Sequence, residues 1–240
     1  MIFRSIFWYF CFAVSLIWHT PRLLWAKRKA RFMEPRDFDR YIQRIASRWA
    51  LGNVKRSGAR FHIEGLENIP KDEAVVFVSN HQGDFDIAAF LAYIPVPHGY
   101  VAKIEMMKVP LLRDWMKHLR CVFIDRSNMR QTARAFLEGV KILKQGHSLV
   151  LFPEGTRSKC EIMGEFKAAS FKLATKARVP IIPVSINGTF RIMEANNRMI
   201  KPADVYVKIY PAIHTDDLED ATGLPEQVKG IIQEGIKIKV

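Results

Sequence analysis

The segment Val75-Val76-Phe77-Val78-Ser79-Asn80-His81-Gln82-Gly83-Asp84-Phe85-Asp86 predicts a buried strand that runs into a polar loop and then a helix. Residues 75–78 are β-branched or aromatic without a break, which is typical of a strand covered on both faces. Asp84 or Asp86 is expected to cap the helix that follows. His81 and Asp86 therefore lie at the end of a strand, where α/β sheets usually carry ligands and catalytic groups.

An imidazole beside a carboxylate is a general base whose tautomer and charge are fixed by its partner. On a continuous helix the gap between His81 and Asp86 would place the two side chains roughly 140° apart. They meet only if the loop folds His81 back over the start of the helix. The alternative is a capped helix that carries an incidental histidine.

Outward from this segment the chain alternates between strand and helix patterns. Further strands are expected at residues 61–65, 99–103, 121–124, 148–152, 181–186 and 205–209. Helices are expected at 129–145, 166–178 and 225–236, with two helical pieces at 104–109 and 111–119 broken by Pro110. This alternation predicts an α/β fold with a mixed, mainly parallel β-sheet flanked by helices. Ser57-Gly58 marks the expected boundary between an N-terminal unit, 1–57, and an α/β domain, 58–240.

Cysteine content and short motifs exclude several common functions. The three cysteines, Cys11, Cys121 and Cys160, are widely spaced and form no CxxC pattern. This argues against a disulfide framework or a zinc site, and we expect no metal. The chain has no Gly-x-Gly-x-x-Gly, P-loop or Gly-x-Ser-x-Gly motif, which removes the commonest nucleotide-binding and serine-hydrolase interpretations.

The N-terminal 60 residues combine an apolar run with most of the positive charge. The net charge is +13, and residues 1–60 hold 13 Lys and Arg against three acidic residues. Residues 6–18 form an apolar run, which is shorter than the about 20 residues that a membrane-spanning helix needs. Aromatic residues cluster in this run and basic residues follow it, an order that favours the membrane interface over nucleic acid. We expect a membrane anchor embedded in one leaflet, with anionic lipids as partners.

A second helix, at about 35–53, is amphipathic. Phe38, Tyr41, Ile42, Ile45 and Trp49 form one face, and arginines line another. Two interpretations are open: this face contacts the membrane as part of a two-helix anchor, or it packs on the α/β domain.

Four blocks in a fixed order resemble the glycerolipid acyltransferase family, often called PlsC-like and typified by 1-acyl-sn-glycerol-3-phosphate acyltransferase. They are Asn80-His81 with Asp86, residues 123–126 (FIDR), residues 151–158 (LFPEGTRS) and residues 179–184 (VPIIPV). The resemblance runs from about residue 58 to about 215. One block alone is a weak signal, but four in the right order and spacing are a strong one.

The resemblance implies direct transfer of an acyl group from a thioester to the hydroxyl of lysophosphatidic acid, which makes phosphatidic acid. His81 is then the general base, with Asp86 holding its ring. Arg157, and less securely Lys103 and Arg126, are expected to bind the acceptor phosphate. Glu154 is expected to bind the glycerol part, and backbone N–H groups around Gly155 and Thr156 to bind phosphate or the developing oxyanion.

The resemblance implies no cofactor: acyl-CoA or an acyl carrier protein thioester is the co-substrate. It implies a membrane-associated protein on the cytoplasmic face, which is the inner membrane if the source is bacterial. Other acceptors stay open (glycerol-3-phosphate, other lysophospholipids, amino-lipids), as do an inactive membrane-surface binding protein and a lipid hydrolase. The chain departs from the family pattern at Ala169, where relatives commonly have Gly.

Overall fold

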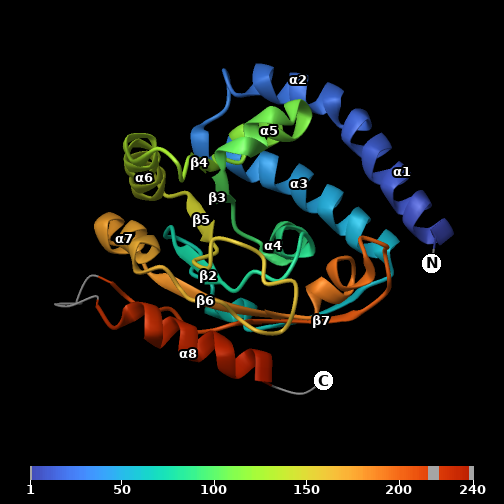
Figure 1. Cartoon of the computed structure of the whole chain (residues 1–240). Coiled ribbons are helices and arrows are strands. Elements are labelled where there is room, and N and C mark those ends of the chain that lie inside the picture. Colours follow the sequence, from blue (N-terminus) through green and yellow to red (C-terminus); the bar gives the residue numbers. More distant parts are fainter. Residues whose placement is uncertain (1, 216–221, 238–240) are drawn as a thin grey trace.

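The computed structural model describes residues 2–215 and 222–237 (Figure 1). The helices are α1 Ile2–Trp18, α2 Thr20–Lys29, α3 Pro35–Ser57, α4 Phe85–Tyr93, α5 Pro110–His118, α6 Met129–Lys144, α7 Ala168–Ala177 and α8 Leu224–Lys237. The strands are β1 Arg60–Glu64, β2 Val76–Ser79, β3 His98–Lys103, β4 Val122–Ile124, β5 Ser148–Leu151, β6 Ile181–Asn187 and β7 Asp204–Ile209. Short 3₁₀ helices are η1 Leu66–Asn68, η2 Ile104–Lys108, η3 Thr189–Arg191 and η4 Glu194–Asn196.

The strands form one sheet in the order β1-β7-β6-β2-β5-β3-β4. Strand β2 lies near its centre and pairs in parallel with β5 and β6. Strand β3 is parallel to β5 and β4, and among the strand pairs of the described residues the β6–β7 pairing alone is antiparallel. The prediction of a mixed, mainly parallel sheet is therefore confirmed. Because β2, β3, β4 and β5 run the same way, the segments that follow them emerge at one edge of the sheet.

Helices cover both faces of the sheet, and each face has its own apolar cluster (Figure 1). On strand β2, Phe77 packs with α3 and α4 on one face, while Val76 and Val78 pack with α6, α7 and α8 on the other. This division explains the unbroken apolar run of β2, because every side chain of this strand faces a helix layer. The central strand is thereby held rigidly where its polar loop begins.

Helix α3 packs its apolar face on the α/β domain. Ile42 is 1% exposed and Ala50 is fully buried in the cluster that includes Phe77 and Phe90 of α4. Of the two interpretations of this amphipathic helix, packing on the domain is the one observed. The expected two-helix anchor stays a prediction: residues 2–57 form α1, α2 and α3, and α1 and α2 together make up one apolar segment. The division at residue 57 as a functional boundary stays a prediction, although Gly58 does end α3 with φ +79°.

Helices α1 and α2 together form the one segment of the described chain that is long and apolar enough to cross a membrane, Ile2–Lys29. Most of its apolar side chains face outward: Phe3 is 88% exposed and Phe10 65%. Figure 1 shows this arm lying along one side of the molecule. An exposed apolar surface of this kind is typical of a membrane-contacting element.

A few residues of α1 point inward and tie the arm to the domain. The buried Trp8 indole donates to the Asn53 carbonyl at 2.9 Å. Tyr9 donates its hydroxyl to the Arg198 carbonyl at 2.8 Å, and the Ile200 N–H donates to Ser5 Oγ at 2.9 Å. Helix α1 is therefore fixed to α3 and to the segment that follows β6.

Candidate active site

The loop from β2 to α4 brings His81 back over the start of the helix. Its ring nitrogen Nδ1 lies 2.6 Å from Asp86 Oδ2. The Asp86 side chain has no exposed surface, whereas 17% of His81 is exposed. A buried carboxylate thus faces one ring nitrogen, and the other nitrogen, Nε2, is the one available to a ligand. The sequence left this geometry open, and the structure brings the pair together.

Asp86 holds the loop together as well as the histidine. Its Oδ2 also accepts the backbone N–H groups of Gln82 at 2.7 Å and Gly83 at 2.9 Å. Its Oδ1 accepts the hydroxyl of Thr189, which is fully buried at the start of η3. Such donors compensate a carboxylate for its removal from water.

The expected helix cap takes another form. Asp84 occupies the N-cap position of α4, but its side chain makes no capping hydrogen bond. Asp86 lies inside the first turn and binds the loop before it. The short loop therefore uses both carboxylates for contacts other than a conventional cap.

The loop after β5 supports His81 from the other side. The Phe152 ring stacks on the imidazole with centroids 4.1 Å apart and an interplanar angle of 19°. Glu154 accepts the His81 backbone N–H at 2.7 Å and the Gly164 N–H at 2.7 Å. Burial raises the pKa of the Glu154 carboxyl, and these two N–H groups oppose that rise. In this structure Glu154 orders two loops, while its expected contact with the glycerol part of an acceptor stays a prediction.

Arg157 is held by two carboxylates at the rim of the site. It donates to Asp84 and lies 3.6 Å from Oε1 of Glu194. Glu194 also accepts the Asp84 N–H at 2.7 Å, and burial raises the pKa of its carboxyl. A Cβ on Gly83 would lie 2.5 Å from Glu194 Oε2, so any larger residue here would displace the Glu194 carboxylate. The guanidinium remains partly exposed, and its expected contact with the acceptor phosphate stays a prediction.

The other expected phosphate-binding residues are spread along the same edge of the sheet. Arg126 follows β4 and donates to the Gly155 carbonyl, and Gly155 adopts φ +75°. The Gly155 N–H donates to the Phe152 carbonyl at 3.0 Å in this structure, and the expected anion contact of the N–H groups around Gly155 and Thr156 stays a prediction. Thr156 is exposed. Lys103 is exposed at the end of β3, and within the described residues it has no hydrogen-bond or ion-pair partner.

Sequence reasoning missed Thr189, Glu194 and Phe152. Thr189 follows an Asn-Gly pair that indicated only a turn, and Glu194 lies in no recognisable motif. Phe152 sits inside a recognised block, where its place before Pro-Glu-Gly was the available signal. The departure at Ala169 has no packing consequence, because this residue is exposed in the first turn of α7.

Within the part of the chain that the structure describes, no group of three His, Cys, Asp or Glu side chains is arranged to hold a metal ion.

Known proteins share this sequence and this fold. Residues 60–187 match the family model described as Acyltransferase. The chain belongs to the acyltransferase family. A probable 1-acyl-sn-glycerol-3-phosphate acyltransferase of Mycoplasma pneumoniae is 41% identical over 149 residues, which are 60% of this chain and 55% of that protein. A chloroplastic 1-acyl-sn-glycerol-3-phosphate acyltransferase of Brassica napus is 32% identical over 183 residues, 74% of this chain and 53% of the relative.

Each of these two matches spans about half the length of the relative. A solved structure covers more: the 1-acyl-sn-glycerophosphate acyltransferase PlsC of Thermotoga maritima aligns with a TM-score of 0.86 at 26% identity, over 98% of this chain and 94% of that one. This acyltransferase therefore shares the fold of PlsC, including the N-terminal helices. The family match ends at Asn187, two residues before Thr189.

Proposed function

We propose that this acyltransferase transfers an acyl group from a thioester to the free hydroxyl of lysophosphatidic acid and so makes phosphatidic acid. The observation that carries the proposal is the contact of His81 Nδ1 with the fully buried Asp86 at the end of the central strand. The names of the relatives supply the acceptor, since both sequence relatives are named as acting on 1-acyl-sn-glycerol-3-phosphate.

His81 is the general base of the proposed reaction. With Nδ1–H donating to Asp86, Nε2 takes the proton from the acceptor hydroxyl as its oxygen bonds to the thioester carbonyl carbon. The tetrahedral intermediate then breaks its C–S bond, and the leaving thiolate takes the proton from the imidazolium. Asp86 stabilises the transient imidazolium, and Phe152 keeps the ring in plane.

Arg157 binds the acceptor phosphate in this account. A guanidinium offers a bidentate fork that matches phosphate geometry. Its present partner Asp84 is half exposed, so an incoming phosphate replaces a carboxylate at the rim, while the buried Glu194 continues to orient the arginine. Arg126 and Lys103 supply further positive charge from the ends of β4 and β3. Holding the phosphate fixes the hydroxyl near the thioester carbon.

We place the reaction at the cytoplasmic surface of a membrane, where the α1–α2 arm meets lipid and thioester donors are soluble. The donor is acyl-CoA or an acyl carrier protein thioester, and no further cofactor is required by the chemistry.

The test supplies purified protein in detergent with both donors in turn and a panel of acceptors, and identifies products by mass spectrometry. We expect phosphatidic acid from lysophosphatidic acid, little product from glycerol-3-phosphate or lysophosphatidylcholine, and a raised KM for the acceptor in Arg157→Gln. Release of free fatty acid in place of phosphatidic acid would show a hydrolase. Failure with every donor and acceptor would support a binding protein.

A further inference from the structure

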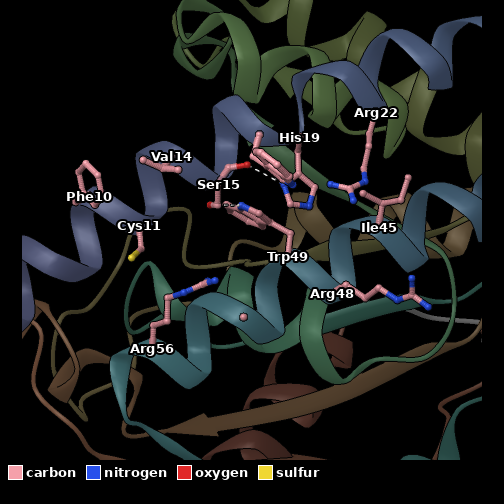
Figure 2. A pocket seen from close by; sticks show the side chains of 12 residues that line it. Phe10, Cys11, Val14, Ser15, His19, Arg22, Ile45, Arg48, Trp49 and Arg56 are labelled. Carbon is pink, nitrogen blue, oxygen red and sulfur yellow. Dashed lines mark hydrogen bonds between the residues drawn. The ribbon is translucent and has the colours of Figure 1, made fainter.

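A groove of about 460 Å³ lies between α1 and α3, separate from the residues of the candidate active site. Figure 2 shows Cys11 and Ser15 on α1 above Arg56 and Trp49 on α3, with Arg22 reaching down from α2. The Trp49 indole donates to Ser15 Oγ at 2.9 Å and so joins the two helices inside the groove. The groove is therefore a fixed feature of the arm and its supporting helix.

The groove is cationic and its charge is uncompensated. Its lining includes three arginines and, among the described residues, no carboxylate. Nor does any of these three guanidinium groups have a hydrogen-bond or ion-pair partner in the described parts of the chain. Arg56 folds along α3 over Gly52, where a Cβ would lie 3.1 Å from Arg56 Nη1. Three free guanidinium groups around one groove suit an anion with several acceptor oxygens.

The walls of the groove are apolar and continue onto the outer surface of α1. Phe10 is 65% exposed and Trp18 70% exposed, on the arm that is long and apolar enough to enter a membrane. A ligand that fits both properties carries a phosphate next to acyl chains. Acyl chains lying along Phe10, Val14 and Trp18 would leave the phosphate among the arginines.

We propose that this groove binds the headgroup phosphate of an anionic membrane phospholipid, as a site distinct from that of the acyl acceptor. The occupant is a whole lipid from the bilayer, because Phe10, Val14 and Trp18 line the groove beside its arginines. Such a site would fix the orientation of the enzyme on anionic membranes beyond the general attraction between basic residues and the surface.

Cys11 lines the groove and reports on its occupancy. In a Cys160→Ser variant the thiols are Cys11 and the buried Cys121. The rate of alkylation by a small maleimide therefore measures the accessibility of Cys11. The alkylation rate is measured in neutral detergent micelles against rising amounts of short-chain phosphatidylglycerol, phosphatidylcholine or inorganic phosphate. We expect saturable protection by phosphatidylglycerol alone.

Two triple variants of equal net charge separate the groove from bulk charge. Arg22→Gln/Arg48→Gln/Arg56→Gln removes the groove cations, whereas Arg28→Gln/Arg44→Gln/Lys55→Gln removes exposed cations outside it. The quantity compared is the phosphatidylglycerol concentration that gives half of the full protection. It should rise by about tenfold or more in the first triple variant, because only this variant loses hydrogen bonds from charged groups to the lipid phosphate. In the second triple variant it should change little. Equal losses in both triples, protection by phosphatidylcholine or by inorganic phosphate, or no protection would each overturn the proposal.

Discussion

Asp86 is the residue on which the geometry of the site depends. Its two carboxylate oxygens form hydrogen bonds with the His81 ring, two backbone N–H groups and the Thr189 hydroxyl. A buried carboxylate with this many donors has a fixed position before any substrate arrives. The orientation of His81 is therefore a property of the free protein.

Thr189→Val tests the part of this network that lies outside the recognised blocks. It removes one donor from Asp86 and keeps the shape of the side chain. Since a hydrogen bond to a charged group contributes about 1.5–3 kcal/mol, we expect kcat to fall by about tenfold or more with KM for both substrates unchanged. Thr189→Ser, which keeps the hydroxyl, should restore most of kcat. Equal kcat values for Thr189→Val and wild type would show that Thr189 does not support Asp86.

His98 gives a pH dependence of stability that is independent of catalysis. It is fully buried, and burial lowers its pKa from 6.5 to about 4. Between these values the unfolded chain binds a proton that the folded protein does not. The free energy of unfolding should therefore fall as pH drops from about 6.5 to about 4, by roughly 3 kcal/mol from this residue.

Urea denaturation at pH 7 and pH 4.5 measures this effect when wild type is compared with His98→Gln. The loss of stability on acidification should be smaller in the variant, because the glutamine does not titrate. Equal losses of stability in the two proteins would show that burial does not lower the pKa of His98 in the folded protein.

Among the elements, α3 carries a clear stability prediction. Ile42 is buried where α3 packs on α4, so Ile42→Ala should lower the free energy of unfolding by about 2–4 kcal/mol. Arg44→Ala, two residues further along and exposed, should change it by less than about 0.5 kcal/mol. Denaturant titration of both variants decides the matter. A small effect of Ile42→Ala on the free energy of unfolding would indicate that this face of α3 contacts the membrane and not the α/β domain.

The same helix shows where sequence reasoning stops. The apolar face of Phe38, Tyr41, Ile42, Ile45 and Trp49 has the helical period that either a membrane or a protein core demands, so periodicity alone does not choose between them. Strands β2 and β5 were predictable because their apolar runs are unbroken, and β6 because its run is apolar except for Ser185 and ends at Asn187-Gly188. The pairing of β1 with β7 was not, because it joins segments more than 140 residues apart with no local signal.

The residues of the candidate site also fall into those that the sequence predicts and those that it does not. His81, Asp86, Glu154 and Arg157 lie in short motifs at the ends of strands, so the sequence places them at one edge of the sheet. Thr189 and Glu194 reach that edge only because β6 pairs with β2 and delivers the following segment there. A contact made by topology has no spacing rule, and for this reason Thr189 and Glu194 were missed, whereas the motif residues were predicted.

At the scale of the whole molecule, the α1–α2 arm and the candidate site contact one segment of chain. Residues 189–200 contact Asp86 through Thr189, Arg157 through Glu194, and α1 through Arg198 and Ile200. The arm that we propose faces lipid thus braces the segment that holds Arg157, the proposed phosphate-binding residue.

The variant Ser5→Ala/Tyr9→Phe removes the two hydrogen bonds from α1 to this segment and leaves the apolar surface of the arm unchanged. We expect KM for the acceptor to rise severalfold in detergent, because Glu194 holds Arg157 less firmly, while vesicle binding stays as in wild type. Deleting residues 2–29, which spares the buried α3, should abolish both vesicle binding and the low KM for the acceptor. Unchanged KM in the double variant would separate the arm from the site.

The central claim is that His81 is the base that activates the acceptor hydroxyl, and His81→Ala tests it most directly. The measurement is kcat and KM for phosphatidic acid formation by purified wild type and variant, with circular dichroism and vesicle flotation as controls for fold and membrane binding. Loss of general-base catalysis predicts a fall in kcat of about 10²–10⁴-fold, with KM for lysophosphatidic acid, fold and flotation unchanged. A variant that keeps the kcat of the wild type would contradict the account.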